Sequence, residues 1–120
     1  MSDPVYHVDG DLVPAGEATV SVTDRGFMYG DAAFETLRAY GGTPFEWDAH
    51  AERLARTCET LGFGESVPAA ADLRQRVDET LAANDLREAY VRLSVTRGVQ
   101  PGKLTPAAEV DPTIVVVVSE

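Results

Sequence analysis

One segment of the chain carries arginine, hydroxyl and aromatic side chains at every second position. In Glu88–Gly98, EAYVRLSVTRG, the polar series Tyr90, Arg92, Ser94 alternates with apolar residues. Because successive side chains of a β-strand point to opposite faces, this spacing predicts a strand with one core face and one polar face. The polar face would offer a guanidinium flanked by hydroxyl groups.

A second segment, AAFETLRAY, repeats this chemistry, with Phe34, Thr36 and Arg38 on one face of an expected strand. A third arginine, Arg53, lies in the first turns of an expected helix, three residues after His50. Arginine suits bidentate binding of carboxylate or phosphate, and the start of a helix favours an anion. We therefore expect the three arginines to converge on a small anionic ligand.

The same patterns also fit a simpler interpretation. A half-exposed antiparallel strand turns its polar face to water, and a single surface arginine commonly pairs with a nearby carboxylate. Residue types and spacing alone leave both interpretations open.

Two helices and a late strand provide the frame for these segments. Asp48 is a plausible N-cap for a helix that runs to about Leu61, and Leu54 and Cys58 on its apolar stripe predict that Cys58 serves packing. A second helix is expected over 69–84, and the β-branched run 114–118 is typical of a strand covered on both faces. The order of elements predicts one α+β domain, a two-layer sandwich of a mostly antiparallel sheet with two helices on one side.

Composition excludes several classes of function. The 120 residues include 20 acidic and 10 basic ones, a net charge of −10, which argues against nucleic acid as a partner. No apolar run approaches the ~20 residues of a membrane helix, and the acidic start does not resemble a signal peptide, so a cytoplasmic location is expected. One cysteine and two histidines make a metal site improbable. Many acids with one lysine suggest adaptation to high salt.

Three motifs in order, DRGFMYGDAAFETLRAY, WDAHAERL and YVRLSVTRG, resemble the N-terminal half of the class IV aminotransferases. These fold-type IV enzymes use pyridoxal 5'-phosphate and include branched-chain aminotransferase, D-amino-acid aminotransferase and aminodeoxychorismate lyase. The resemblance extends from Tyr6 to about Val118. It implies that residues 1–120 are the small N-terminal domain, that a C-terminal domain absent from this chain completes the cofactor site, and that the full-length enzyme is a homodimer.

The resemblance also implies roles for individual residues. Arg53 matches the arginine that binds the cofactor phosphate, and His50 matches a histidine near that site. The residues that match the substrate side of the pocket are Phe34, Thr36, Arg38, Tyr90 and Arg92. The Schiff-base lysine of the family belongs to the C-terminal domain, and Lys103 does not match it. The 120-residue chain alone is therefore expected to be inactive.

Position 36 separates the reactions of the family. Thr36 is typical of aminodeoxychorismate lyases, which form 4-aminobenzoate and pyruvate for folate biosynthesis, and its hydroxyl group would assist the departing pyruvate. Gly102 and Leu104 stand where D-amino-acid transaminases carry an R-x-H carboxylate trap. Tyr90 and Arg92 favour instead a branched-chain or other L-amino-acid transaminase. A non-catalytic acidic binding module is a third alternative.

Overall fold

The computed structural model describes residues 3–102 and 104–120. Its six strands form one sheet in the order β2-β1-β6-β5-β3-β4, and every neighbouring pair is antiparallel. The strands are β1 (Val5–Val8), β2 (Asp11–Pro14), β3 (Ala32–Tyr40), β4 (Thr43–Pro44), β5 (Ala89–Thr96) and β6 (Ile114–Ser119). The helices are α1 (Arg25–Tyr29), α2 (Trp47–Leu61) and α3 (Ala70–Ala83), with short 3₁₀ turns at Ala15–Glu17 and Gly64–Ser66.

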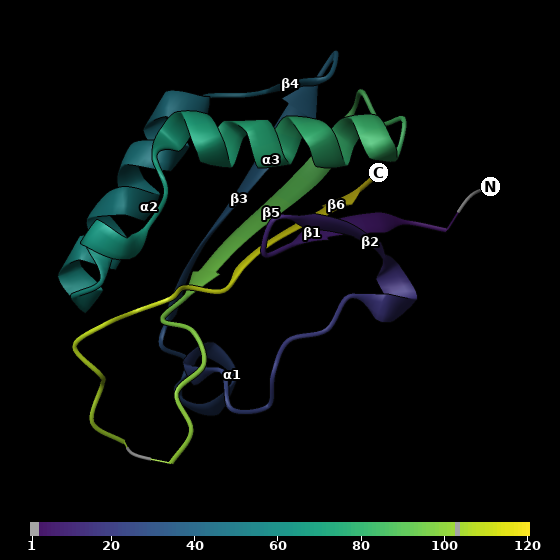
Figure 1. Cartoon of the computed structure of the whole chain (residues 1–120). Helices are drawn as coiled ribbons and strands as arrows, with labels where there is room; N and C mark the ends of the chain where they lie inside the picture. The colour runs from purple at the N-terminus through teal and green to yellow at the C-terminus, as the bar shows by residue number, and fades with distance from the viewer. Residues whose placement is uncertain (1–2, 103) are drawn as a thin grey trace.

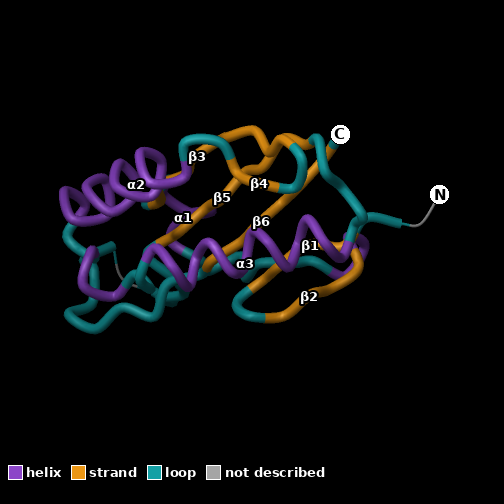
Figure 2. The backbone as a smooth tube through the Cα atoms, turned by 90° about the horizontal axis from the view of Figure 1, so that it is seen from above, coloured by secondary structure: helices purple, strands orange, loops and turns teal. Residues whose placement is uncertain are grey.

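The two long helices cover one face of the sheet. Figure 1 shows α2 and α3 on the upper side of the sheet, and the view from above in Figure 2 shows α3 crossing over the strands and α2 on the β3 side. The short helix α1 and the loop before β6 lie on the other side, at one end of the sheet (Figure 1). The predicted α+β sandwich with two helices on one side is confirmed.

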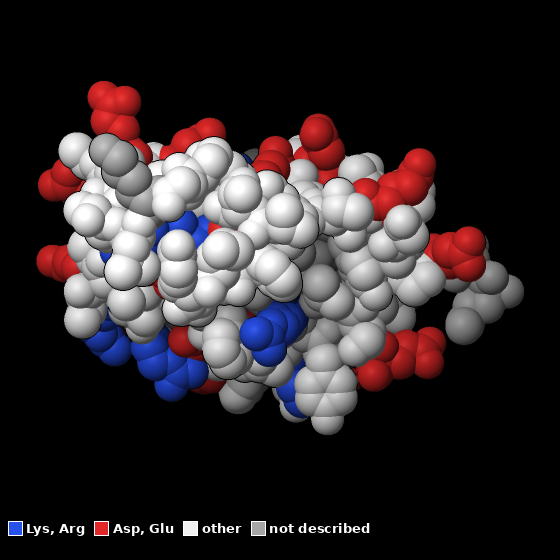
Figure 3. All heavy atoms as spheres, turned by 90° about the horizontal axis from the view of Figure 1, so that it is seen from below, with Lys and Arg blue, Asp and Glu red and all other residues white. Residues whose placement is uncertain are grey.

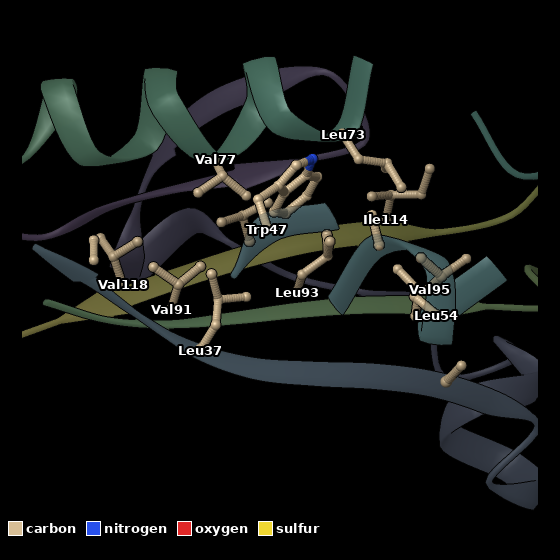
Figure 4. Packing of buried hydrophobic residues seen from close by; sticks show 14 of the residues in the cluster. Leu37, Trp47, Leu54, Leu73, Val77, Val91, Leu93, Val95, Ile114 and Val118 are labelled. Atoms are coloured by element: carbon tan, nitrogen blue, oxygen red, sulfur yellow. The ribbon is translucent and has the colours of Figure 1, made fainter. Parts of the chain in front are cut away.

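The core fills the space between these layers. Figure 4 shows Leu73 and Val77 of α3 pointing toward Trp47 and the strand side chains. Below them lie Val91, Leu93 and Val95 of β5, which are fully buried. Burial of a Val or Leu side chain contributes about 1.5–3 kcal/mol, so this layer supplies the main stabilising contacts of the chain. Cys58 is also buried in this layer, as its place on the apolar stripe of α2 predicts.

The ends of α3 agree with the helix expected from the sequence, whereas for α2 only the C-terminal end agrees. Ala69 and Asn84 cap α3, and the Asn84 amide bonds the backbone N–H and C=O of Val5, which ties β1 to this helix. Gly62 caps the C-terminus of α2 in the left-handed conformation. The N-cap of α2 is Glu46, not Asp48, which lies in the first turn. Asp48 remains favourable there because a carboxylate stabilises the positive end of the helix dipole.

Within the part of the chain that the structure describes, only one face of the last strand is covered by helices. Val116 is fully buried under the helices, whereas Val115 and Val117 on the other face are only half-buried. The β-branched run reflects β-propensity as well as burial, so it does not by itself specify a second covering layer.

The segment between β2 and β3 contains the five-residue helix α1. The Asp24 side chain accepts a hydrogen bond from the Gly26 N–H at 2.7 Å and caps α1. Its other oxygen accepts from Thr96 Oγ1 at the end of β5. A Cβ on Gly26 would lie 2.5 Å from Thr96 Cγ2, so this close approach needs glycine. In the described part of the chain, no helix has the length and apolar character needed to cross a membrane.

Candidate functional site

The open face of the sheet, opposite α2 and α3, carries all five residues that the resemblance assigns to the substrate. In the register of β3 and β5, Thr36 lies opposite Arg92 and Arg38 lies opposite Tyr90. Phe34 is 54% exposed and Tyr90 is 49% exposed. The sequence therefore predicted correctly which side chains share this face.

Aromatic rings hold the two arginines of this face in place. The Arg92 guanidinium lies 4.0 Å from the centre of the Phe34 ring, and that of Arg38 lies 4.2 Å from the Tyr90 ring. The centre of the Tyr40 ring lies 5.5 Å from the same Arg38 guanidinium. Stacking of this kind contributes about 0.5–1 kcal/mol at exposed sites and fixes the plane of the guanidinium.

Neither of these arginines forms an ion pair with a carboxylate of the described residues. Arg38 Nε is buried and has no hydrogen-bond partner there, although an unsatisfied buried donor is costly. In a protein with twice as many acids as bases, two unpaired cations on one face are unexpected. Figure 3 views the molecule from this side, with basic side chains toward its middle and lower left and acidic ones chiefly around the rim. This arrangement can bind an anion.

The third arginine lies on the other side of the sheet. Arg53 of α2 donates from Nε and Nη2 to the Glu35 carboxylate, at 2.9 Å to Oε2 and 2.7 Å to Oε1. His50 Nδ1 lies 2.7 Å from the same Oε1. The hydrogen bonds from Arg53, opposed by burial and helped by His50, hold the pKa of Glu35 below its usual value.

The structure thus corrects the expectation that the three arginines converge. Arg38 and Arg92 share the open face, while Arg53 projects from the helix layer. Arg53 lies at an outer edge of the sheet. Most of β3 forms this edge, because β4 pairs with β3 only at Ala39 and Tyr40. The Arg53 side chain is 61% exposed there. One ligand would have to reach around this edge to contact both groups.

Sequence reasoning missed Glu35. The signal was present, since the alternation places a carboxylate on the apolar face of β3, between Ala33 and Leu37. A buried charge at such a position needs a partner in the covering layer. That partner is an arginine of α2, and the alternation within β3 does not reveal which helix residue will lie against the strand. Lys103 lies outside the described residues.

The other reactive groups of the described chain have structural roles. Burial raises the pKa of the Cys58 thiol to about 11, so this cysteine is inert at neutral pH. No group of three or more metal-ligating side chains occurs among residues 3–102 and 104–120. Arg25 and Arg97 both pair with Asp31, which fixes α1 against the end of β5.

A family model described as "Amino-transferase class IV" matches residues 32–120, the part of the chain that contains both faces of this site. The chain belongs to the class IV aminotransferase family. Its sequence is 40% identical over 109 residues to a Methanocaldococcus jannaschii protein named "Putative branched-chain-amino-acid aminotransferase", covering 90% of this chain and 37% of that protein. It is 34% identical over 110 residues to a Staphylococcus haemolyticus D-alanine aminotransferase, covering 89% and 38%.

Among solved structures, the fold is similar to that of 4-amino-4-deoxychorismate lyase from Pseudomonas aeruginosa. The TM-score is 0.78 and the identity 37%, over 95% of this chain and 39% of that one. The chain therefore spans less than two fifths of the length of these class IV relatives. Their names cover three different reactions at similar identity.

Proposed function

We propose that this chain is the N-terminal domain of a pyridoxal-phosphate-dependent class IV enzyme, and that the enzyme is an aminodeoxychorismate lyase. The observation that carries the proposal is the pair of unpaired guanidiniums, Arg38 and Arg92, on the same face as the Thr36 hydroxyl. The substrate of a lyase of this kind is anionic, and its reaction releases pyruvate, a second anion. A face with two free cations and a hydroxyl group suits both requirements.

The residues at the edge of β3 fit the phosphate of the cofactor. Glu35 occupies Nε and Nη2 of Arg53, and the rest of this exposed guanidinium is free to donate to phosphate oxygens. Bound pyridoxal phosphate supplies an electron sink for the substrate amine. The lysine that anchors it would come from the C-terminal domain, so the 120-residue chain would be inactive alone.

On the open face, each residue would have a distinct task. Arg92, held by Phe34, and Tyr90 would bind a substrate carboxylate, and Arg38 would bind a second anionic group. Thr36, directly opposite Arg92, would donate a hydrogen bond to the oxygen of the departing pyruvate. We further propose that a second domain covers this face and that the full-length enzyme is a cytoplasmic homodimer.

A branched-chain or other L-amino-acid transaminase is the second candidate. The Tyr90–Arg92 pair favours it, and so does the 40% identity to the M. jannaschii protein. Such an enzyme would use the same two arginines for the carboxylates of its amino-acid and keto-acid substrates.

Product analysis of the full-length enzyme separates the two candidates. With aminodeoxychorismate and no keto acid, we expect 4-aminobenzoate and pyruvate, and we expect Thr36→Gly to lower this turnover. Glutamate formed from leucine and 2-oxoglutarate, with no aminobenzoate in the first assay, would identify a transaminase and contradict the lyase proposal.

A further inference from the structure

Glu35 is a carboxylate at a position where the fold calls for an apolar side chain. It is 6% exposed and lies on the helix-facing side of β3, in line with the buried residues Ala33 and Leu37. Removal of a carboxylate from water costs several kcal/mol unless its oxygens are fully bonded. Its presence therefore calls for a reason beyond packing.

Both oxygens of Glu35 are occupied by donors from α2. Arg53 Nε lies 3.1 Å from Oε1 and 2.9 Å from Oε2, and Nη2 lies 2.7 Å from Oε1. Because an ionised carboxylate only accepts, His50 Nδ1 must carry the proton of the fourth contact, at 2.7 Å. Nη2 of Arg53 and Nδ1 of His50, 3.5 Å apart, are then both donors to one oxygen and do not bond each other.

The hydrogen bonds to Glu35 fix the orientation of the Arg53 side chain. An arginine that is 61% exposed has many rotamers, and a bidentate carboxylate selects the few that keep Nε and Nη2 against Glu35. The opposite edge of the planar guanidinium, with both N–H groups of Nη1, then points away from Glu35. No described residue bonds Nη1.

We propose that Glu35 is a positioning residue, which aims the free edge of Arg53 at the phosphate of the cofactor. This inference rests on the proposed function, because it assumes that Arg53 binds that phosphate. Glu35 does not touch the ligand itself.

The position of Glu35 in β3 gives this contact a further consequence. Its two neighbours in the strand, Phe34 and Thr36, point to the open face, so one rigid strand carries both the support of Arg53 and the substrate-side residues. Glu35 would thereby set the position of the phosphate relative to Thr36 and Arg92 across the edge of the sheet. A helix that shifted along β3 would change that relation.

The test compares two ligands that differ only in the phosphate, pyridoxal 5'-phosphate and pyridoxal, bound to the full-length protein. In Glu35→Gln, an amide N–H faces the Arg53 donors in place of one acceptor oxygen. We expect the affinity for pyridoxal 5'-phosphate to fall about tenfold or more, the size of one lost charge-assisted hydrogen bond, and that for pyridoxal to change less than about twofold. Arg53→Ala should also lower the preference for pyridoxal 5'-phosphate over pyridoxal. Adding Glu35→Gln to Arg53→Ala should have no further effect on this preference.

Two further variants serve as a matched control and as a substitute in case Glu35→Gln does not fold. Glu52→Gln on the same helix removes an exposed glutamate that pairs with Arg56, and it should leave both affinities unchanged. If Glu35→Gln does not fold, Glu35→Asp keeps the charge but withdraws it by one methylene, and we expect an intermediate loss of the phosphate preference.

Equal losses of affinity for the two ligands in the Glu35 variants would mean that Glu35 only stabilises the fold, and unchanged affinities would mean that it has no role toward Arg53. Either result overturns the inference and leaves the proposed function intact, provided that Arg53→Ala still lowers the phosphate preference. If the wild-type protein binds neither ligand, the proposed function fails and the inference fails with it.

Discussion

The two faces of the central strands β3 and β5 solve opposite physical problems with adjacent residues. On the helix-covered face, Val91, Leu93 and Val95 are removed from water, and the buried charge of Glu35 is matched by Arg53 and His50. On the open face, half-exposed rings support two guanidiniums that no described carboxylate neutralises. One face stabilises the fold, and the other keeps unpaired charge available.

Among the described residues, the open face lacks ion pairs that the composition of the chain could have supplied. Two unpaired arginines do little for stability, yet the net charge of −10 gives abundant acids with which they could have paired. Under the function proposed above, an anionic ligand would be the counterpart of these cations. Glu35 joins the two faces, because it lies in the stabilising layer and holds a residue that we propose to be functional.

The largest contrast should come from truncation of neighbouring residues of β5. Leu93→Ala removes a fully buried side chain and should lower the free energy of unfolding by about 2–5 kcal/mol. Arg92→Ala loses one stacking contact and should cost less than about 1 kcal/mol. Urea denaturation of both variants measures the difference, and similar losses would contradict the division between the faces.

The order should reverse when activity is measured. In the full-length enzyme, Arg92→Ala should lower kcat/KM about 10- to 100-fold, the equivalent of one lost charge-assisted hydrogen bond to a substrate carboxylate. Arg56→Ala, which removes an exposed arginine that is paired with Glu52, is the matched control and should leave kcat/KM unchanged. An active Arg92→Ala enzyme would remove the open face from the proposed site.

Acid should weaken the charge pairs behind and beside the sheet but leave the arginines of the open face charged. Glu35 has a lowered pKa through Arg53 and His50; burial raises the pKa of Asp31, but the bonds from Arg97 and Arg25 outweigh it, so that pKa is lowered too. Both groups therefore stabilise the fold fully above their ordinary values of 4.5 and 3.8, and this contribution is lost as the pH falls through the lowered values.

Urea denaturation between pH 7 and pH 3 should accordingly show a loss of stability that begins below about pH 4.5, with a slope of at most about 1.4 kcal/mol per pH unit for each group. Glu35→Gln should reduce this slope, whereas Glu52→Gln should preserve it. If the free energy of unfolding of Glu35→Gln falls with pH as steeply as that of the wild type, the carboxylate of Glu35 is not coupled to folding.

The smallest effect is expected from salt. Screening of the net charge of −10 should raise Tm by several degrees between dilute buffer and molar NaCl. The highest Tm in dilute buffer would contradict the high-salt adaptation suggested by the composition.

Local periodicity was sufficient for much of this structure. The alternation in AAFETLRAY and YVRLSVT determined which side chains share a face, because the direction of a side chain in a strand depends only on its place in the sequence. The helix expected over 69–84 likewise matches α3, Ala70–Ala83, to within one residue at each end. These features come from the backbone geometry of each element.

Only the tertiary structure decided how the elements meet. The placement of Arg53 behind the sheet, its bond to Glu35, and the half-exposed second face of β6 depend on where α2 and α3 lie against the strands. The sequence distinguishes the faces of each element, but it does not state which face of a neighbour each will contact. That choice is made by the joint packing of all the elements, and here it separated one arginine from the other two.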